Sequence, residues 1–221
     1  MKKYFVLFLI SASFLYALKN QTGFEARMKQ MGLVNIQNLS QSILVDLKYS
    51  SEDNFMKKDV YGDLNSCFLQ KEAADMLLNA EKNLKKQNKN YLFLVYDCAR
   101  PRSVQEIMWE IVKDTPEKIY VANPKSGSIH NYGSAVDLTV VDEKGVPLDM
   151  GTPYDFFGDL AQPKYENKFL KEGKLTQKQI ENRKILRKSM ENAGFKNISN
   201  EWWHFDAFPR AITKKRFKII E

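Results

Sequence analysis

The pattern of apolar and polar positions predicts a mixture of helices and strands. Between residues 70 and 87, apolar side chains recur every three or four positions, which is the period of an amphipathic helix. The capping sequence Thr176-Gln-Lys-Gln179 predicts a second helix that runs to about Ala193 and is closed by Gly194. Two shorter helices are predicted, over residues 22–31 and from a capping box at Ser103-Val-Gln-Glu106 to about residue 113.

Apolar or alternating runs predict the strands. The most apolar of them has the length of a buried strand, and a proline follows it closely. Because the residue before a proline is disfavoured in a helix, Arg100, which precedes Pro101, is expected in a turn just past that strand. The four predicted strands are Ser42–Lys48, Tyr91–Tyr96, Ala135–Val141 and Trp202–Phe208. Together the elements predict an α+β domain.

The pattern fails over residues 142–174. This stretch contains glycines and prolines together with several aromatic residues, among them Tyr154, Phe156 and Phe157. A connection this long inside a compact domain is typical of a lid or a binding loop. We therefore expect it to close over a site.

Composition narrows the function classes. The chain has 221 residues, 43% of them hydrophobic, which suits one ordinary globular domain. The net charge is +7, but lysines and acidic residues alternate through most of the chain. No basic block is interleaved with aromatic residues as a nucleic-acid surface requires, so nucleic-acid binding is disfavoured.

The first residues predict export. Met1-Lys2-Lys3 precedes an apolar run from Tyr4 to Ala17, which is shorter than the roughly 20 residues that cross a bilayer. This is the shape of a signal peptide, residues 1–17, cut after Ala17 to leave a domain over residues 18–221. A retained membrane anchor is the alternative. No other segment has the length and apolarity to span a membrane, so we expect a soluble periplasmic or secreted protein without stable membrane insertion after cleavage.

Two cysteines, Cys67 and Cys98, leave two interpretations open. They can form one disulfide in an oxidising compartment, or one of them can be buried apolar filler. They are too few to form a zinc site of their own.

The candidate chemistry gathers around the two histidines, His130 and His204. Asp137 follows the first, and Glu201 precedes the second by three residues. Two imidazoles and one carboxylate suffice for a catalytic zinc site, which keeps its fourth position for water. Gly133 permits a turn between His130 and the strand that carries Asp137. The alternative is that each histidine is a hydrogen-bonded core residue.

Strand geometry constrains the acidic residues. Val136, Leu138 and Val140 form an apolar face of the predicted strand, and Asp137 lies on the other face. A buried acid there needs a partner, for which a metal is suited. Residues three apart on a strand point to opposite faces, so Glu201 must precede the strand of His204, in a turn or at a bulge, if it is to act on the same metal. A solvated loop glutamate is the alternative.

The motifs around these residues resemble those of the zinc D-alanyl-D-alanine dipeptidases, whose wider relatives include lysostaphin, zinc D-Ala-D-Ala carboxypeptidases and hedgehog. The similarity extends from about Asp46 to Phe208. The matching segments are Tyr96-Asp-Cys-Ala-Arg-Pro101, Ser128-Ile-His-Asn-Tyr-Gly-Ser-Ala-Val-Asp137, Gly133-Ser-Ala-Val-Asp-Leu-Thr139, Met150-Gly-Thr-Pro-Tyr-Asp155, Arg187-Lys-Ser-Met-Glu-Asn-Ala-Gly-Phe195 and Glu201-Trp-Trp-His204. The chain departs from the family pattern at Cys98-Ala99, where relatives carry a glycine and an aromatic residue.

The resemblance implies a role for each matching residue. It implies one zinc ion per chain with His130, Asp137 and His204 as ligands, Glu201 as the catalytic base and Arg100 as the group that stabilises the transition state. It also implies that the dipeptide is held by Ser128, Asp155 and Tyr49, with Asp155 facing its ammonium group. The implied fold is a single α+β domain with a central, mostly antiparallel sheet flanked by helices and the zinc site on the sheet.

The function implied is hydrolysis of the free dipeptide D-Ala-D-Ala to two D-alanines. A zinc D,D-carboxypeptidase that trims peptidoglycan stem peptides is the first alternative, and Asp155 discriminates because such an enzyme needs no acid aimed at an amine. An inactive zinc-containing binding protein is the second, and the presence of both Arg100 and Glu201 disfavours it. The sequence predicts no oligomeric state.

Overall fold

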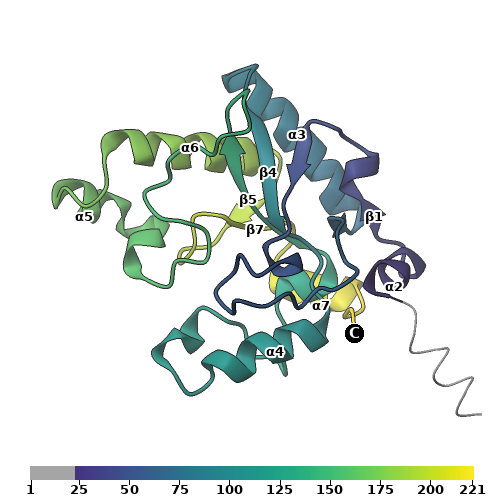
Figure 1. Cartoon of the computed structure of the whole chain (residues 1–221). Coiled ribbons are helices and arrows are strands. Elements are labelled where there is room, and N and C mark those ends of the chain that lie inside the picture. The colour runs from purple at the N-terminus through teal and green to yellow at the C-terminus, as the bar shows by residue number, and fades with distance from the viewer. Residues whose placement is uncertain (1–22) are drawn as a thin grey trace, which may run out of the picture.

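The apolar runs pair into a five-stranded sheet in the computed structural model of the chain, which describes residues 23–221 (Figure 1). The strand order is β2-β4-β5-β7-β6, and β1 and β3 form a small separate pair. Only β2 and β4 run parallel, and the other neighbouring strands are antiparallel. The bounds are β1 Val34–Asn35, β2 Ile43–Val45, β3 Phe68–Leu69, β4 Leu92–Asp97, β5 Ala135–Val141, β6 Lys196–Asn197 and β7 His204–Asp206. The predicted α+β class with a mostly antiparallel sheet is confirmed.

Helices flank the sheet. The long helices α3 and α6 pack against each other, α3 against β4 and α6 against β5. The helix α4 lies near the end of β4, from which the chain enters it (Figure 1). The bounds are α2 Phe24–Gln30, α3 Lys71–Gln87, α4 Arg102–Val112, α5 Glu166–Lys171, α6 Gln177–Glu191 and α7 Arg210–Arg216. The predicted signal segment, residues 1–17, lies outside the described residues.

Two apolar clusters cover the sheet. In one, Leu77 and Leu84 of α3 and Leu186 of α6 join the buried side chains of β4 and β5. In the other, Val104 and Met108 of α4 pack with residues from the segments before β3. All seven residues of β5 are buried as a result. The strand that carries Asp137 is therefore covered by protein on both faces.

The two predicted capping boxes have different outcomes. The Thr176 box is confirmed, because the Thr176 hydroxyl accepts from the Gln179 backbone N–H at 3.2 Å and the Gln179 side chain accepts in return. The Ser103 box is wrong: α4 begins at Arg102, its N-cap is Pro101, and no side chain caps it. The Pro101 carbonyl accepts the first helical bonds, and the Arg102 N–H donates instead to the distant Ile220 carbonyl at 2.7 Å.

The predicted loop over residues 142–174 is held against the rest of the domain by hydrogen bonds from α6. It contains α5 and short turns that the sequence pattern did not predict. Arg183 of α6 is 1% exposed and donates to the carbonyls of Met150 and Leu160 at 2.7 and 3.0 Å. These bonds fix the backbone on both sides of Tyr154 and Asp155, whose side chains reach the site described below.

The two cysteines pair. A Cys67–Cys98 disulfide joins the segment before β3 to the turn after β4, with the Cα atoms 5.4 Å apart. A bond that closes a loop of 31 residues stabilises a fold by about 3–4 kcal/mol in the chain-entropy account. It also anchors the turn that carries Arg100.

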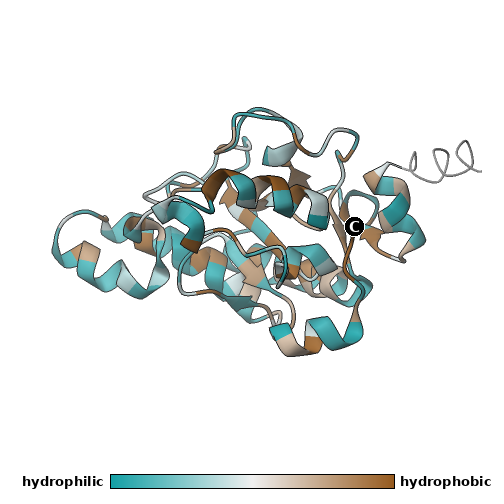
Figure 2. Cartoon of the chain, turned by 90° about the horizontal axis from the view of Figure 1, so that it is seen from below, coloured by the Kyte–Doolittle hydropathy of each residue, from teal (hydrophilic) through white to brown (hydrophobic). Residues whose placement is uncertain are grey.

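The described surface is mostly polar. In Figure 2, seen from the α4 side, apolar colour runs along α4, where Ile107 and Ile111 are each 43% exposed. Within residues 23–221, no helix has the length and apolarity that crossing a membrane requires.

Candidate functional site

Three side chains from neighbouring elements converge on one point. His130 lies in a short 3-10 helix, Ile129–Tyr132, while Asp137 of β5 and His204 of β7 are partners across the two antiparallel strands. Gly133 ends the 3-10 helix at φ +64° and turns the chain into β5, as the sequence predicted. One nitrogen or oxygen atom from each of His130, Asp137 and His204 lies within 4.8 Å of the others.

Hydrogen bonds on the outer side of each imidazole set its orientation. The His130 Nδ1–H donates to the Cys98 carbonyl at 2.7 Å, and the His204 Nε2–H donates to the Asp206 carboxylate at 2.9 Å. In these tautomers His130 Nε2 and His204 Nδ1 both present lone pairs, although they lie 3.1 Å apart. Asp137 Oδ1 is 3.2 and 2.9 Å from them. Three acceptor atoms therefore face one buried point, an arrangement that a cation stabilises.

The charges of the cluster support the same conclusion. Burial lowers the pKa of His204, but Asp206 and Asp137 outweigh it, and the pKa lies well above its ordinary value. Burial raises the pKa of Asp137, but the two histidines hold it well below its usual range. The cluster thus attracts positive charge. Two imidazole nitrogens and a carboxylate oxygen are a donor set that suits catalytic zinc.

Glu201 lies beside this cluster. It precedes β7 instead of belonging to it, as strand geometry required, and its Oε2 atom is 4.0 Å from His204 Nδ1. Burial, with a contribution from Asp137, raises the pKa of Glu201 to about 7. A cation held by the three ligands would favour the ionised form and counter this shift. A carboxylate so placed can take up a proton at neutral pH.

Arg100 is fixed on the other wall. Its Nε and Nη2 atoms donate to Asp97 at 3.0 and 2.5 Å, and Nη1 donates to Gln105 at 2.8 Å. Asp97 is fully buried and also accepts from the Tyr61 hydroxyl. The Arg100 backbone N–H donates to the His130 carbonyl at 3.0 Å. The turn with the guanidinium is therefore tied directly to the turn with a candidate ligand.

Asp155 and Tyr49 lie together on the wall of the cavity. The Tyr49 hydroxyl donates to Asp155 at 2.9 Å, and the Asp155 backbone has φ +57°, a left-handed conformation that few residues other than glycine adopt. Burial raises the pKa of Asp155 well above its ordinary value, and Asp137 adds to the effect. Asp155 is partly buried and makes no ion pair with the described residues, so its carboxylate can bind a cationic group of a ligand.

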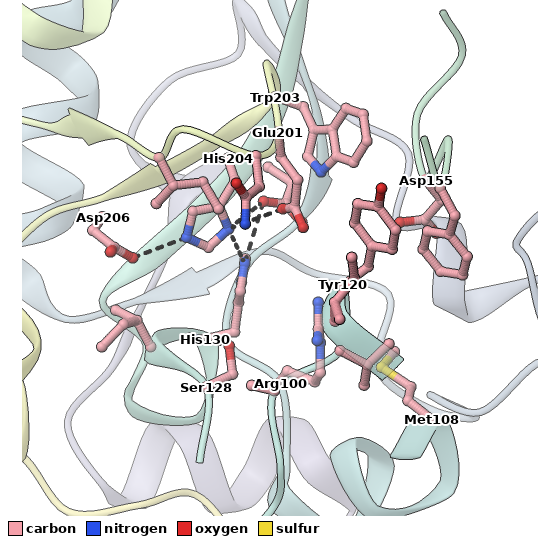
Figure 3. A pocket seen from close by; sticks show the side chains of 18 of the residues that line it. Arg100, Met108, Tyr120, Ser128, His130, Asp155, Glu201, Trp203, His204 and Asp206 are labelled. Atoms are coloured by element: carbon pink, nitrogen blue, oxygen red, sulfur yellow. Dashed lines mark hydrogen bonds and ion pairs between the residues drawn. The ribbon is translucent and has the colours of Figure 1, made fainter. Parts of the chain in front are cut away.

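Every residue that the sequence singled out lies on one cavity of about 260 Å³. Figure 3 shows Glu201 and His204 above His130, with Arg100 and Asp155 on the side opposite Asp206. Ser128 also has a local role, because its hydroxyl accepts from the His130 backbone N–H at 3.3 Å. The candidates brought together are Tyr49, Arg100, Ser128, His130, Asp137, Asp155, Glu201 and His204.

Comparison with known proteins identifies the family. The family model described as D-ala-D-ala dipeptidase matches residues 29–220. The chain belongs to this dipeptidase family. It is 32% identical to the D-alanyl-D-alanine dipeptidase of Escherichia coli (strain K12), over 82% of this chain and 86% of the relative. It is 31% identical to the D-alanyl-D-alanine dipeptidase of Enterococcus faecium, over 80% of this chain and 91% of the relative.

Membership makes the protein a metallopeptidase of a zinc-dependent family. The His130, Asp137 and His204 cluster can hold a metal ion. The expected membership of the dipeptidase family is confirmed. The expected zinc cofactor is supported by the zinc dependence of the family and by a cluster that can hold a metal ion.

Sequence reasoning missed two residues that orient the cluster in this dipeptidase-family protein. Asp206 binds the outer nitrogen of His204, and its signal was present, because residues two apart on a strand share a face. The Tyr154 hydroxyl donates to Asp137 Oδ2 at 3.1 Å and lies 3.3 Å from the Tyr49 hydroxyl. In the sequence, the one indication that Tyr154 belongs to the site was its position next to Asp155 in the irregular segment.

Proposed function

We propose that the protein hydrolyses the free dipeptide D-Ala-D-Ala to two molecules of D-alanine with one zinc ion per chain. The observation that carries the proposal is Asp155, a partly buried carboxylate on the wall of the cavity that also holds Glu201, Arg100 and the candidate ligands. A free dipeptide carries an ammonium group close to its only peptide bond. The names of the relatives support the same substrate.

The residues have separate tasks in this proposal. His130, Asp137 and His204 would hold the zinc, which would polarise the carbonyl as a Lewis acid and lower the pKa of water so that a nucleophile is available at neutral pH. Glu201 takes the proton of the attacking water and gives it to the departing amine. Arg100 donates hydrogen bonds to the carbonyl oxygen as negative charge develops there. The Asp155 carboxylate pairs with the ammonium group of the dipeptide, and the Tyr49 hydroxyl holds that carboxylate in place by its hydrogen bond.

Two other functions fit the site less well. A D,D-carboxypeptidase that acts on stem peptides needs no acid aimed at a substrate amine, whereas Asp155, held by the Tyr49 hydroxyl, lines this cavity. An inactive zinc protein needs neither a partly buried glutamate beside the metal cluster nor an arginine fixed across from it. We therefore keep the dipeptidase as the proposal.

Acetylation of the substrate amine tests the role of Asp155. We expect catalytic efficiency on acetyl-D-Ala-D-Ala to fall by roughly 30-fold or more, because a buried charge pair is commonly worth about 2–5 kcal/mol when one partner is removed. Asp155→Asn should weaken hydrolysis of the free dipeptide selectively. The measurement is kcat/KM for both substrates with both proteins.

The matched control is Asp159→Asn, a change of the same kind in the same segment but outside the cavity lining. It should behave as wild type on both substrates. Equal rates of the wild type on free and acetylated dipeptide would contradict the dipeptidase proposal, and a preference for the acetylated form would favour a carboxypeptidase.

Metal content tests the ligand set. We expect one zinc per chain in the wild type and its loss in His130→Ala or Asp137→Ala, because a catalytic site needs three protein ligands. Elemental analysis after dialysis is the measurement. Less than about a tenth of an equivalent in the zinc-loaded wild type would overturn the assignment.

We also propose that the protein is exported and that residues 1–17 are removed as a signal peptide. The basic leader and short apolar run support this. The Cys67–Cys98 disulfide supports it independently, because such bonds persist in oxidising compartments. The N-terminal residue of the protein recovered from a periplasmic fraction tests it, and an intact Met1 would contradict cleavage.

A further inference from the structure

Two guanidinium groups line the cavity, those of Arg100 and Arg210. Arg100 is neutralised by its ion pair with the buried Asp97. Within residues 23–221, no carboxylate lies within 4.0 Å of the Arg210 guanidinium. The proposed function gives Arg100 a role but gives none to Arg210. The described residues do not neutralise the positive charge of Arg210.

The contacts of Arg210 hold it beside one part of the cavity. It is the first residue of α7, and its Nη2 atom donates to the carbonyl of Ser126 at 2.8 Å and to that of Gly127. These two carbonyls immediately precede Ser128, which lines the cavity and caps the turn of His130. The contacts occupy one of the three guanidinium nitrogens. Nε and Nη1 have no hydrogen-bond partner among the described residues.

This position differs from that of Asp155. Figure 3 shows Asp155 on one side of the two histidines and Asp206 on the other, with Ser128 below His130. Arg210 follows Asp206 by four residues and is bound to the segment that leads into Ser128. The cavity therefore has a carboxylate on the side opposite Asp206 and a guanidinium bound to the segment that leads into Ser128, and neither makes an ion pair with the described residues.

We propose that Arg210 binds the C-terminal carboxylate of the dipeptide. The inference rests on the proposed function and deepens it, because D-Ala-D-Ala is a zwitterion whose two charged ends are separated by roughly 7 Å when extended. A planar guanidinium with two free donor nitrogens matches a carboxylate in geometry as well as in charge. Asp155 and Arg210 then select both ends of the substrate, so that a peptide extended at either end loses one of the two ion pairs.

The test is a comparison of D-Ala-D-Ala with D-Ala-D-alaninamide, which keeps the peptide bond and the ammonium group but lacks the carboxylate charge. We expect the wild type to have a KM about 5-fold lower for the acid than for the amide, the upper end for an ion pair made by an exposed side chain. Arg210→Gln should raise KM about 5-fold for the acid and leave KM for the amide and both kcat values nearly unchanged. Arg210→Lys should recover part of the preference.

Lys215→Gln is the matched control, because it removes the same charge from an exposed position on the same helix. It should leave the preference intact, which separates a contact from general electrostatic attraction. The same comparison is made by calorimetric binding of both ligands to zinc-loaded Glu201→Gln protein, with and without Arg210→Gln. This measurement does not depend on turnover.

Each outcome decides a different point. A wild type that neither hydrolyses nor binds D-Ala-D-Ala contradicts the proposed function itself. A wild type that uses the dipeptide without preferring the acid contradicts the role of Arg210. An Arg210→Gln protein impaired equally on acid and amide also contradicts it, since that result assigns Arg210 only to bracing the Ser126–Gly127 backbone.

Discussion

Replacing Glu201 with glutamine is expected to lower kcat on D-Ala-D-Ala by about 100- to 10,000-fold, the usual contribution of a positioned general base. Glutamine has nearly the same shape and is uncharged, so it fills the partly buried position without the desolvation cost of a charge. Glu201 is not among the three residues whose ligand atoms converge, so the zinc content should stay at one equivalent per chain. The measurements are kcat and elemental analysis on the same preparation.

Glu181→Gln on the exposed side of α6 is the control and should change neither quantity. Wild-type turnover in Glu201→Gln would remove the glutamate from the mechanism. Loss of zinc together with turnover would instead make Glu201 part of the metal site.

The regular elements were predictable because their signals are local. The helices α3 and α6 and the strands β4 and β5 show their periodicity within one segment, and the structure places them near the predicted bounds. The two-residue strands β1, β3 and β6 gave no such signal, because two residues are too few to show a period. The strands β1 and β3 form only through pairing with each other across more than 30 residues of sequence. The start of α4 was misjudged for the same reason: a distant carbonyl, that of Ile220, takes the Arg102 N–H.

The site was predictable where one residue type is rare. The chain has two histidines, and each has an acidic residue nearby in sequence, so the cluster could be proposed although His130 and His204 are 74 positions apart. Asp97, Tyr154 and Arg210 belong to common residue types, and their contacts cross the fold. No period or spacing in the sequence indicates that Asp97 holds Arg100 or that Tyr154 holds Asp137.

Removing the Arg100 side chain has two separable consequences. Arg100→Gln is expected to lower kcat by about 100- to 1000-fold, because a donor to the developing oxyanion is lost. It should also lower the free energy of unfolding by about 3–5 kcal/mol, because Asp97 then stays buried without its ion-pair partner. Turnover and the denaturant midpoint measure the two effects. The control for a lost arginine is Arg102→Gln, a half-exposed neighbour whose ion pair is with the exposed Glu221.

A second substitution separates the chemistry from the stability. Asp97→Asn in the Arg100→Gln protein removes the uncompensated charge, and the asparagine can still accept from the Tyr61 hydroxyl. The unfolding free energy should then recover much of the loss, since replacing both partners of a buried pair costs far less than removing one. The rate should not recover, because the donor to the substrate oxygen is still missing. Recovery of turnover with stability would show that Arg100 acts only by neutralising Asp97, and the oxyanion would then depend on the metal and other donors alone.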